Sequence, residues 1–338
     1  METVRRTKAA WQRVLDALEA RPLLLCLAAV GIAAGVSLAM ASVSGWTRID
    51  HVLGHLELWW LVVVVAGWAI SYLGYTVAHH RTAALCGAKL TRRASLYAVT
   101  FGAAATCLRS GYSVDHRALR HGGAEPESAR VGVLNLAVLE YAALAPAAWI
   151  CALILLHSQR VQQQVTVPWA VGVPVGVALA VAIGCYFGRR VPTGAGPIAS
   201  TVRGGLLALC QLGHQLRHPV RNREAWLGMA THWASDIAAL WAALLMTGVH
   251  PAPAIVILGF ATGYACTPRS MPLTGVGVTE ALMPLAFMWE GVPLASAVVA
   301  VFIYRLARLV LAVPPALLTH EQVRRMAALP AVQRALAH

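Results

Sequence analysis

Apolar runs of about 20 residues recur along the chain, and short polar turns separate them. A helix of that length crosses a bilayer core of about 30 Å. Six runs reach this length, over residues 23–43, 58–78, 131–156, 165–187, 225–249 and 293–319. The pattern predicts an all-α polytopic membrane protein with about six full transmembrane helices.

Two further apolar segments, 94–108 and 251–290, are broken by Gly, Pro and charged residues. Cytoplasmic loops of membrane proteins carry an excess of Lys and Arg. In this chain the basic residues gather at the N-terminus, at 79–93, at 188–224 and near the C-terminus, whereas the turns at 44–57, 157–164 and 250–253 hold two between them. A complete crossing by 94–108 would therefore carry the most basic loop to the outside.

We predict instead two re-entrant hairpins of opposite orientation, with 94–130 entering from the cytoplasmic side and 251–290 from the outside. Their sequences are also alike. Each has a Gly/Ala-rich arm and an Arg-Ser pair, Arg109-Ser110 or Arg269-Ser270, and then Gly, Pro and Ser-Ala before an apolar helix. Such an inverted repeat is typical of transporters, which bind substrate between the broken elements. Chance similarity between segments rich in small residues is the alternative.

These boundaries divide the chain into three parts. Residues 1–22 form a basic, amphipathic cytoplasmic leader, and 320–338 form a cytoplasmic tail. Between them, 23–319 form a single transmembrane domain, with repeat halves at about 56–157 and 225–319 and a basic cytoplasmic loop at 188–224. The first apolar run is longer than that of a usual signal peptide, so we interpret it as a retained helix.

Composition narrows the choice of partner. The net charge is +13, and 58% of the residues are hydrophobic. The basic residues lie in membrane-flanking loops and no soluble basic domain is present, so we expect the membrane and not a nucleic acid as partner. The seven cysteines are scattered singly through apolar sequence, which predicts packing residues without a structural disulfide.

The stretch MPLTGVGVTE, residues 271–280, interrupts the second hairpin. Gly275 and Gly277 permit a turn with exposed backbone N–H groups, and a helix starting near Val278 would point its positive end into that turn. This favours a cradle for a phosphate. The alternative is a plain re-entrant turn in which Glu280 stabilises its own helix N-terminus, and the two roles are compatible.

Charged residues within the last apolar run need a partner. Arg305 and Arg308 fall in its middle, one turn apart on one face. A charge at that depth costs at least about 2.5 kcal/mol, so both should face the protein interior. We predict Glu280 as the partner of Arg305. A structural ion pair and the binding of a lipid headgroup both remain open.

Other polar residues lie inside predicted spans. His232 and Asp236 share a face of one span, and Glu140 lies in another. Ionisable residues at such depth indicate function, here a proton path, or else hydrogen bonds between helices. Arg117, beyond the first hairpin turn, would either join the same cavity or remain a solvated loop charge.

The chain contains two pairs of His with helical spacing but no known metal-binding motif. HVLGHLE (51–57) and HQLRH (214–218) each place two His on one helical face, but neither is HExxH. We therefore predict no metal ion and no cofactor. The amphipathic stretch 201–217 is expected to lie against anionic lipid on the cytoplasmic face, or to be a simple loop between the halves.

Pro272 to Glu280, followed by Gly291-Val-Pro and then Tyr304-Arg305, resembles the P-x-G-G-x-G-x-x-E, G-V and Y-R ending of the lysylphosphatidylglycerol synthase/flippase transmembrane-region family. Arg117 within DHRALRHGG resembles that family's earlier G-x-x-R-x-x-L element. The likeness covers about residues 20–320. Thr274 replaces one Gly of the family's pair, and the first hairpin lacks the usual Pro-Gly-Gly.

The resemblance implies a lipid translocator of the inner membrane, without the soluble synthase domain, that handles anionic or aminoacylated phospholipids. A headgroup phosphate would lie at the Gly275–Val278 turn, and the residues expected to bind it are Arg117, Arg269, Gly275, Gly277, Glu280, Arg305 and Arg308. Two alternatives stay open. One is a membrane-embedded enzyme of phospholipid or polyprenyl-phosphate metabolism, and the other is a non-catalytic partner of a separate lipid synthase.

Overall fold

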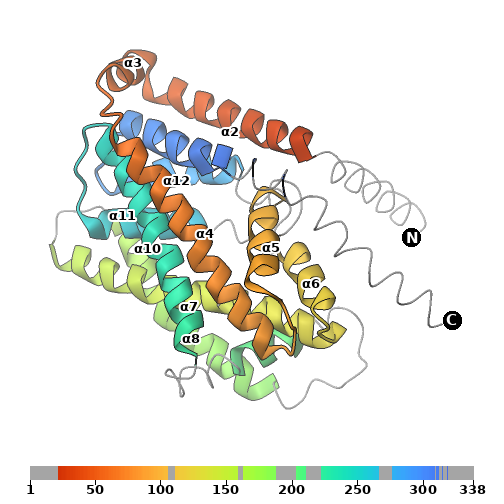
Figure 1. The fold of residues 1–338 in the computed structure, drawn as a ribbon. Coiled ribbons are helices and arrows are strands. Elements are labelled where there is room, and N and C mark those ends of the chain that lie inside the picture. Colours follow the sequence, from red (N-terminus) through yellow and green to blue (C-terminus); the bar gives the residue numbers. More distant parts are fainter. Residues whose placement is uncertain are drawn as a thin grey trace, which may run out of the picture.

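The computed structural model describes residues 22–105, 111–158, 163–187, 203–210, 222–265 and 276–308, with a few single positions up to 318. Every regular element within these ranges is a helix (Figure 1). The prediction of an all-helical chain is confirmed for this part of the molecule.

The first predicted span is α2 (Pro22–Ser44), and it ends in a sharp bend. Gly45 follows with a φ of 92°, a left-handed value that Gly adopts without steric cost. The next helix, α3 (Trp46–Gly54), leaves at 108° to the end of α2. The sequence predicts a turn over 44–57, whereas the structure forms a short amphipathic helix there. The polar residues of this helix lie on its exposed side, and its one buried residue is Ile49.

The two helices at the centre of the molecule are α4 (Trp60–Leu85) and α10 (Arg223–Met246), which lie side by side (Figure 1). They run antiparallel. Next to the start of α4, the Glu57 N–H donates to the Met246 carbonyl at 3.0 Å, and at its other end Arg81 forms an ion pair with Glu224. Both ends of the pair are therefore fixed.

Glycines allow α4 and α10 to approach closely. A Cβ on Gly74 would lie 2.7 Å from the Gly228 carbonyl oxygen, and a Cβ on Gly228 would lie 2.7 Å from that of Gly74. These distances leave no room for a side chain on either helix. Small residues are common where membrane helices pack backbone to backbone.

The same order of elements follows each central helix. After α4 come α5 (Arg92–Ala105), α6 (Gly111–His121) and the long α7 (Pro126–Ser158). After α10 come α11 (Pro253–Ala265), α12 (Val278–Trp289) and a helix over 294–308. Since α4 and α10 are antiparallel, the two series start in opposite directions, as the two halves of an inverted repeat do.

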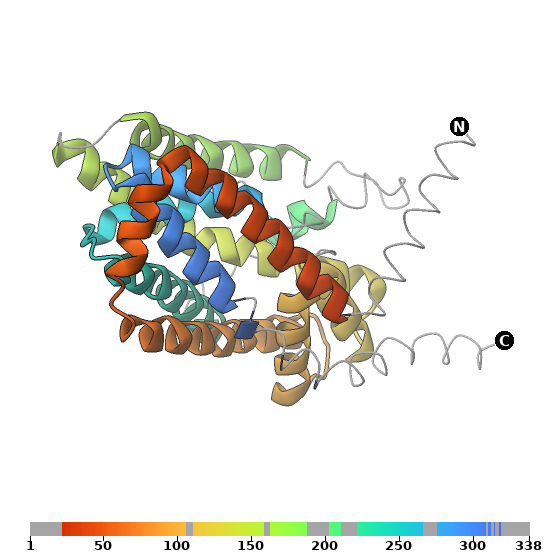
Figure 2. The same ribbon diagram turned by 90° about the horizontal axis from the view of Figure 1, so that it is seen from above.

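The remaining helices cover this framework. α8 (Gln163–Phe187) packs on α7, where the Trp149 indole donates to the Ala170 carbonyl at 3.0 Å. Figure 2 shows α2 lying over the C-terminal helices, with α5 and α6 grouped at one end of the molecule. α2 and α3 contribute Ala41 and Ile49 to an apolar cluster with Val298 and Val299 of the 294–308 helix. Residues 203–210 form a short helix within the stretch expected to be amphipathic.

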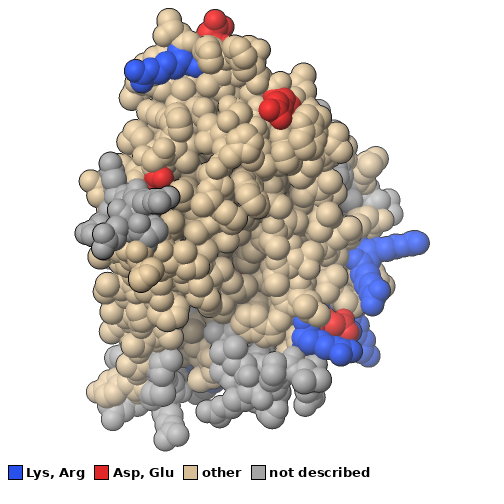
Figure 3. Space-filling view, turned by 90° about the vertical axis from the view of Figure 1, so that its left-hand side faces the viewer, with Lys and Arg blue, Asp and Glu red and all other residues tan. Residues whose placement is uncertain are grey.

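Charge is distributed as a membrane protein requires. On the face seen in Figure 3, Lys, Arg, Asp and Glu gather mainly towards two ends, and a broad zone between them is almost free of charge. Among the described helices, α4 and α7 are long and apolar enough to cross a membrane, and the bent pair α2–α3 makes a third if counted as one span. α10 is long enough, but His232 and Asp236 in its middle lower its mean hydropathy.

Candidate functional site

The N-terminus of α12 is formed by the end of the MPLTGVGVTE motif. Gly277 has a φ of 89°, and the helix begins at Val278, as predicted. Oε2 of Glu280 accepts the Gly277 N–H at 2.6 Å. A carboxylate in this position pairs a helix N–H that would otherwise lack a partner, and its charge interacts favourably with the helix dipole. Glu280 therefore stabilises its own helix, which is one of the two roles left open by the sequence.

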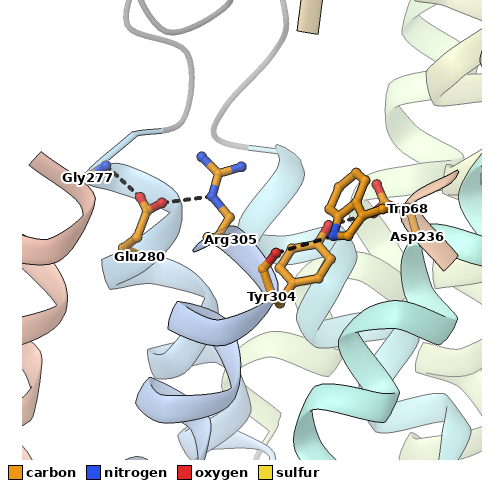
Figure 4. Close-up of polar contacts among 6 residues, drawn as sticks. All are labelled: Trp68, Asp236, Gly277, Glu280, Tyr304 and Arg305. Atoms are coloured by element: carbon orange, nitrogen blue, oxygen red, sulfur yellow. Dashed lines mark hydrogen bonds and ion pairs between the residues drawn. The ribbon is translucent and has the colours of Figure 1, made fainter. Parts of the chain in front are cut away.

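The second carboxylate oxygen of Glu280 accepts a hydrogen bond from Arg305, which lies on the 294–308 helix (Figure 4). Nε of Arg305 lies 2.7 Å from Oε1, and the two side chains are only 9% and 0% exposed. The predicted pair is thus present, and it joins α12 to the last described helix. Because both charges are buried, each compensates the other.

Arg305 uses only part of its hydrogen-bonding capacity. Its Nε faces Glu280, while the two terminal nitrogens point away from that carboxylate (Figure 4). Within the described part of the chain, these nitrogens make no hydrogen bond. A guanidinium presents further N–H donors there, in a planar arrangement that fits the oxygens of a phosphate or carboxylate.

Tyr304 and Arg308, which lie next to Arg305 on the 294–308 helix, contact the central helices α4 and α10. The Tyr304 hydroxyl donates to Oδ1 of Asp236 on α10 at 2.7 Å, and the Trp68 indole of α4 donates to the Tyr304 carbonyl at 3.3 Å (Figure 4). The Arg308 guanidinium carbon lies 4.6 Å from the centre of the Trp68 ring, a cation–π contact. Arg305 and Arg308, expected on one face, therefore contact different helices, α12 and α4.

A second buried carboxylate, Glu140 on α7, lies among aromatic residues. Oε1 accepts from the Tyr75 hydroxyl of α4 at 2.7 Å, and Oε2 accepts from the Tyr264 hydroxyl of α11 at 2.6 Å. The Trp233 indole of α10 donates to the Glu140 carbonyl at 2.9 Å. Glu140 thus joins three other helices, as the hydrogen-bonding interpretation of the sequence required.

His232 lies near this group, one turn from Asp236 on α10. Its Nδ1 is 2.7 Å from the Ser71 hydroxyl oxygen of α4. Its ring meets the Tyr75 ring edge to face, with 5.1 Å between the ring centres. The predicted intramembrane residues Glu140, His232 and Asp236 are therefore all buried, and each makes a hydrogen bond to a side chain of another helix.

Other predicted residues lie elsewhere. Arg117 is a half-buried residue of α6, so it belongs to the helix pair that follows α4 and not to the one that carries Glu280. Arg269 and Gly275 lie outside the described residues.

The sequence did not predict a role for His79 of α4. Its Nε2 lies 3.5 Å from Oδ1 of Asp115 on α6, and both side chains are fully buried. The only available signal was that a carboxylate in an apolar helix pair needs a partner.

The described residues include no group of three or more His, Cys, Asp and Glu side chains that could hold a metal ion. His51 of α3 and His55, which follows this helix, stack with 4.5 Å between ring centres, and His214 and His218 lie outside the described residues.

The arrangement defines a class: a helical membrane protein with buried ionic and polar groups at the contacts between its helices. The chain belongs to the family described as the lysylphosphatidylglycerol synthase TM region, whose model matches residues 26–316. A comparison with curated proteins gave no match. Family membership makes this a membrane protein of lipid metabolism or transport, as the motif in α12 had indicated.

Proposed function

We propose that this protein translocates anionic or aminoacylated phospholipids across a bacterial-type inner membrane, with the headgroup bound next to Arg305. The observation that carries the proposal is the buried Arg305, with Nε on Glu280 and its terminal nitrogens directed away. A phosphate oxygen accepts well from a guanidinium, and the N-terminus of α12 lies close by and favours a negative charge. Gly277 and Glu280 would shape this position.

The remaining predicted contacts are part of the same proposal. Arg269 and Gly275 would contribute from the segment before α12, and Arg308 and Arg117 would attract the headgroup along its path. Glu280 would hold Arg305 in place and would also meet a headgroup amine when one is present.

The topology proposed with this function has about six full spans and two re-entrant hairpins of opposite orientation, α5–α6 and α11–α12, with both termini in the cytoplasm. The antiparallel contact of α4 and α10 supports it, since each begins one series of helices. The basic residues of the turns support it independently.

The hydrogen bonds of Glu280 favour a transport function over an enzymatic one. Both of its oxygens accept hydrogen bonds from groups that only donate, so this carboxylate is poorly suited to exchange a proton with a substrate. A role as partner of a separate synthase would use the basic loop 188–224, and co-purification with such an enzyme would test it.

Reconstitution tests the proposal. The purified protein is placed in vesicles that contain headgroup-labelled phosphatidylglycerol, and the appearance of label in the opposite leaflet is followed over time. We expect translocation well above that of protein-free vesicles. Transfer at the protein-free rate by protein whose helix content and melting temperature are intact would overturn the proposal.

A further inference from the structure

Glu140 differs from Glu280 in the kind of groups that surround its carboxylate. Glu280 meets a guanidinium and a backbone N–H, which donate hydrogen bonds and cannot accept them. Glu140 meets the hydroxyls of Tyr75 and Tyr264, which can do either. The first setting suits a carboxylate alone. The second also suits a protonated carboxyl, because one tyrosine hydroxyl can rotate and accept a hydrogen bond from the carboxyl O–H.

Polar groups extend from Glu140 across the neighbouring helices. Tyr75 of α4, Tyr264 of α11 and Trp233 of α10 donate hydrogen bonds to Glu140, and further along lie Ser71 of α4 and His232 of α10, which contact each other. His232 lies against Tyr75, and one turn further along α10 Asp236 accepts from Tyr304. Ionisable residues arranged in this way within a membrane domain mark proton pathways.

Tyr264 connects Glu140 with the proposed headgroup site, because the helix that carries Tyr264 packs on α12. α11 carries Tyr264 and packs tightly on α12. A Cβ on Gly259 would lie 2.5 Å from the Phe287 ring, and one on Gly263 would lie 2.8 Å from Met283. Because packed helices with no free space move together, a change at Tyr264 would be passed to α12, whose first turn holds Glu280.

We propose that Glu140 is the proton-binding group that couples lipid translocation to a proton gradient. In the step, a proton adds to one carboxylate oxygen, and the resulting O–H donates to the oxygen of Tyr75 or Tyr264, whose own proton turns away. No other bond forms or breaks. Protonation removes the negative charge that strengthens the hydrogen bond between Tyr264 of α11 and Glu140 of α7. The contact between these two helices weakens, and α11 and α12 can then move together away from α7. This inference rests on the proposed function.

Glu140→Gln tests the coupling in vesicles with and without a pH gradient. For one proton per lipid, a gradient of one pH unit changes the driving force by about 1.4 kcal/mol, which is about tenfold in an equilibrium distribution. We expect the initial rate of the wild-type protein to change several-fold with the gradient and that of Glu140→Gln to stay constant. Glu57→Gln, at an exposed glutamate, should respond as the wild-type protein does.

The possible outcomes separate the two proposals. If the wild-type protein does not translocate lipid, the proposed function is overturned. Translocation that ignores the gradient, or a Glu140→Gln variant that still responds to it, would overturn the coupling alone.

A second measurement covers the case in which Glu140→Gln fails to fold. Infrared difference spectra of the purified protein between acidic and alkaline buffer should contain the carbonyl band of a protonated carboxyl. In Tyr264→Phe, which keeps Glu140 but removes one hydrogen bond, this band should shift. A band that is unaffected by Tyr264→Phe would contradict the assignment to Glu140, as would its absence from the wild-type spectrum.

Discussion

Glu280 and Arg305 are each buried charges, and each is tolerated in the protein interior because the other is present. Removing one member of such a pair typically costs about 3–5 kcal/mol, since it leaves the other charge without compensation. We therefore expect Glu280→Ala and Arg305→Ala each to lower the free energy of unfolding by several kcal/mol in detergent.

The double variant Glu280→Ala/Arg305→Ala should lose clearly less than the sum of the two single losses, because no uncompensated charge remains. Denaturant titration followed by tryptophan fluorescence measures all three. Glu127→Ala, at a glutamate whose side chain is 67% exposed, serves as control and should change little. Additive losses in the cycle would contradict an interaction between the two residues.

Glu290, in the turn that ends α12, makes stability depend on pH. It is buried, its Oε1 lies 3.5 Å from the Thr166 hydroxyl, and its Oε2 has no hydrogen-bond partner among the residues that the structure describes. Burial raises the pKa of this carboxyl to about 7. Because the folded-state pKa is raised, the folded protein binds the proton more tightly than the unfolded chain does. The stabilisation from this proton is therefore full below the unfolded pKa of 4.5, and it is lost as pH rises through about 7.

Melting temperatures between about pH 5 and pH 8 test this. The wild-type protein should lose stability over this range, by up to about 1.4 kcal/mol for each unit of pKa shift. Glu290→Gln, which is neutral throughout, should lose less. Identical pH dependence in both proteins would show that Glu290 is not the group responsible.

The sequence predicted the partner of Arg305 but not those of Asp236 and Glu140. A buried arginine requires an acid, and Glu280 was the acid in the neighbouring motif, so the pair followed from charge alone. Tyr304 and Tyr75 are neutral, and nothing in the helical periodicity says which helix each hydroxyl faces. Those contacts depend on how the 294–308 helix packs on α10 and how α4 packs on α7, and one sequence does not contain this information.

Among the elements, α4 and α10 pack closely because small residues lie at their contact. Gly74→Ala or Gly228→Ala would place a methyl group against the backbone of the partner helix, and overpacking of this kind typically costs about 1–3 kcal/mol. Gly172→Ala in α8 is the matched control, since a Cβ there meets nothing within 4 Å. We expect lower melting temperatures for the first two and an unchanged or higher one for the control. Equal effects at all three positions would contradict close packing of α4 on α10.

The long helices were predicted closely, and the short ones less well. The predicted span 23–43 corresponds to α2, and 165–187 to α8, because an apolar run without charges leaves few other choices in a membrane. The hairpin predicted over 94–130 corresponds to the two helices α5 and α6, but the sequence did not predict where each of them begins and ends. α3 was missed because its pattern, short and polar, resembles a turn.

At the scale of the whole molecule, the proposed topology places α3 outside and the start of α7 in the cytoplasm. Arg48→Cys on α3 and Glu127→Cys on α7, in a background without native cysteines, test this with a membrane-impermeant maleimide on intact cells. Residue 48 should be labelled in intact cells, and residue 127 only after lysis. Labelling of both in intact cells, or of residue 127 alone, would contradict the topology.

Arg305 is proposed to bind the phosphate of a translocated lipid, and the variant Arg305→Lys tests this binding. Lysine keeps the charge opposite Glu280 but lacks the planar set of donors that a guanidinium offers to an oxyanion. The decisive measurement is the initial rate of labelled phosphatidylglycerol translocation by this variant in reconstituted vesicles, after its melting temperature has been shown to be near that of the wild-type protein. We expect a rate at least about tenfold lower than that of the wild-type protein, the equivalent of about 1.4 kcal/mol. Translocation at the wild-type rate by folded Arg305→Lys would contradict it.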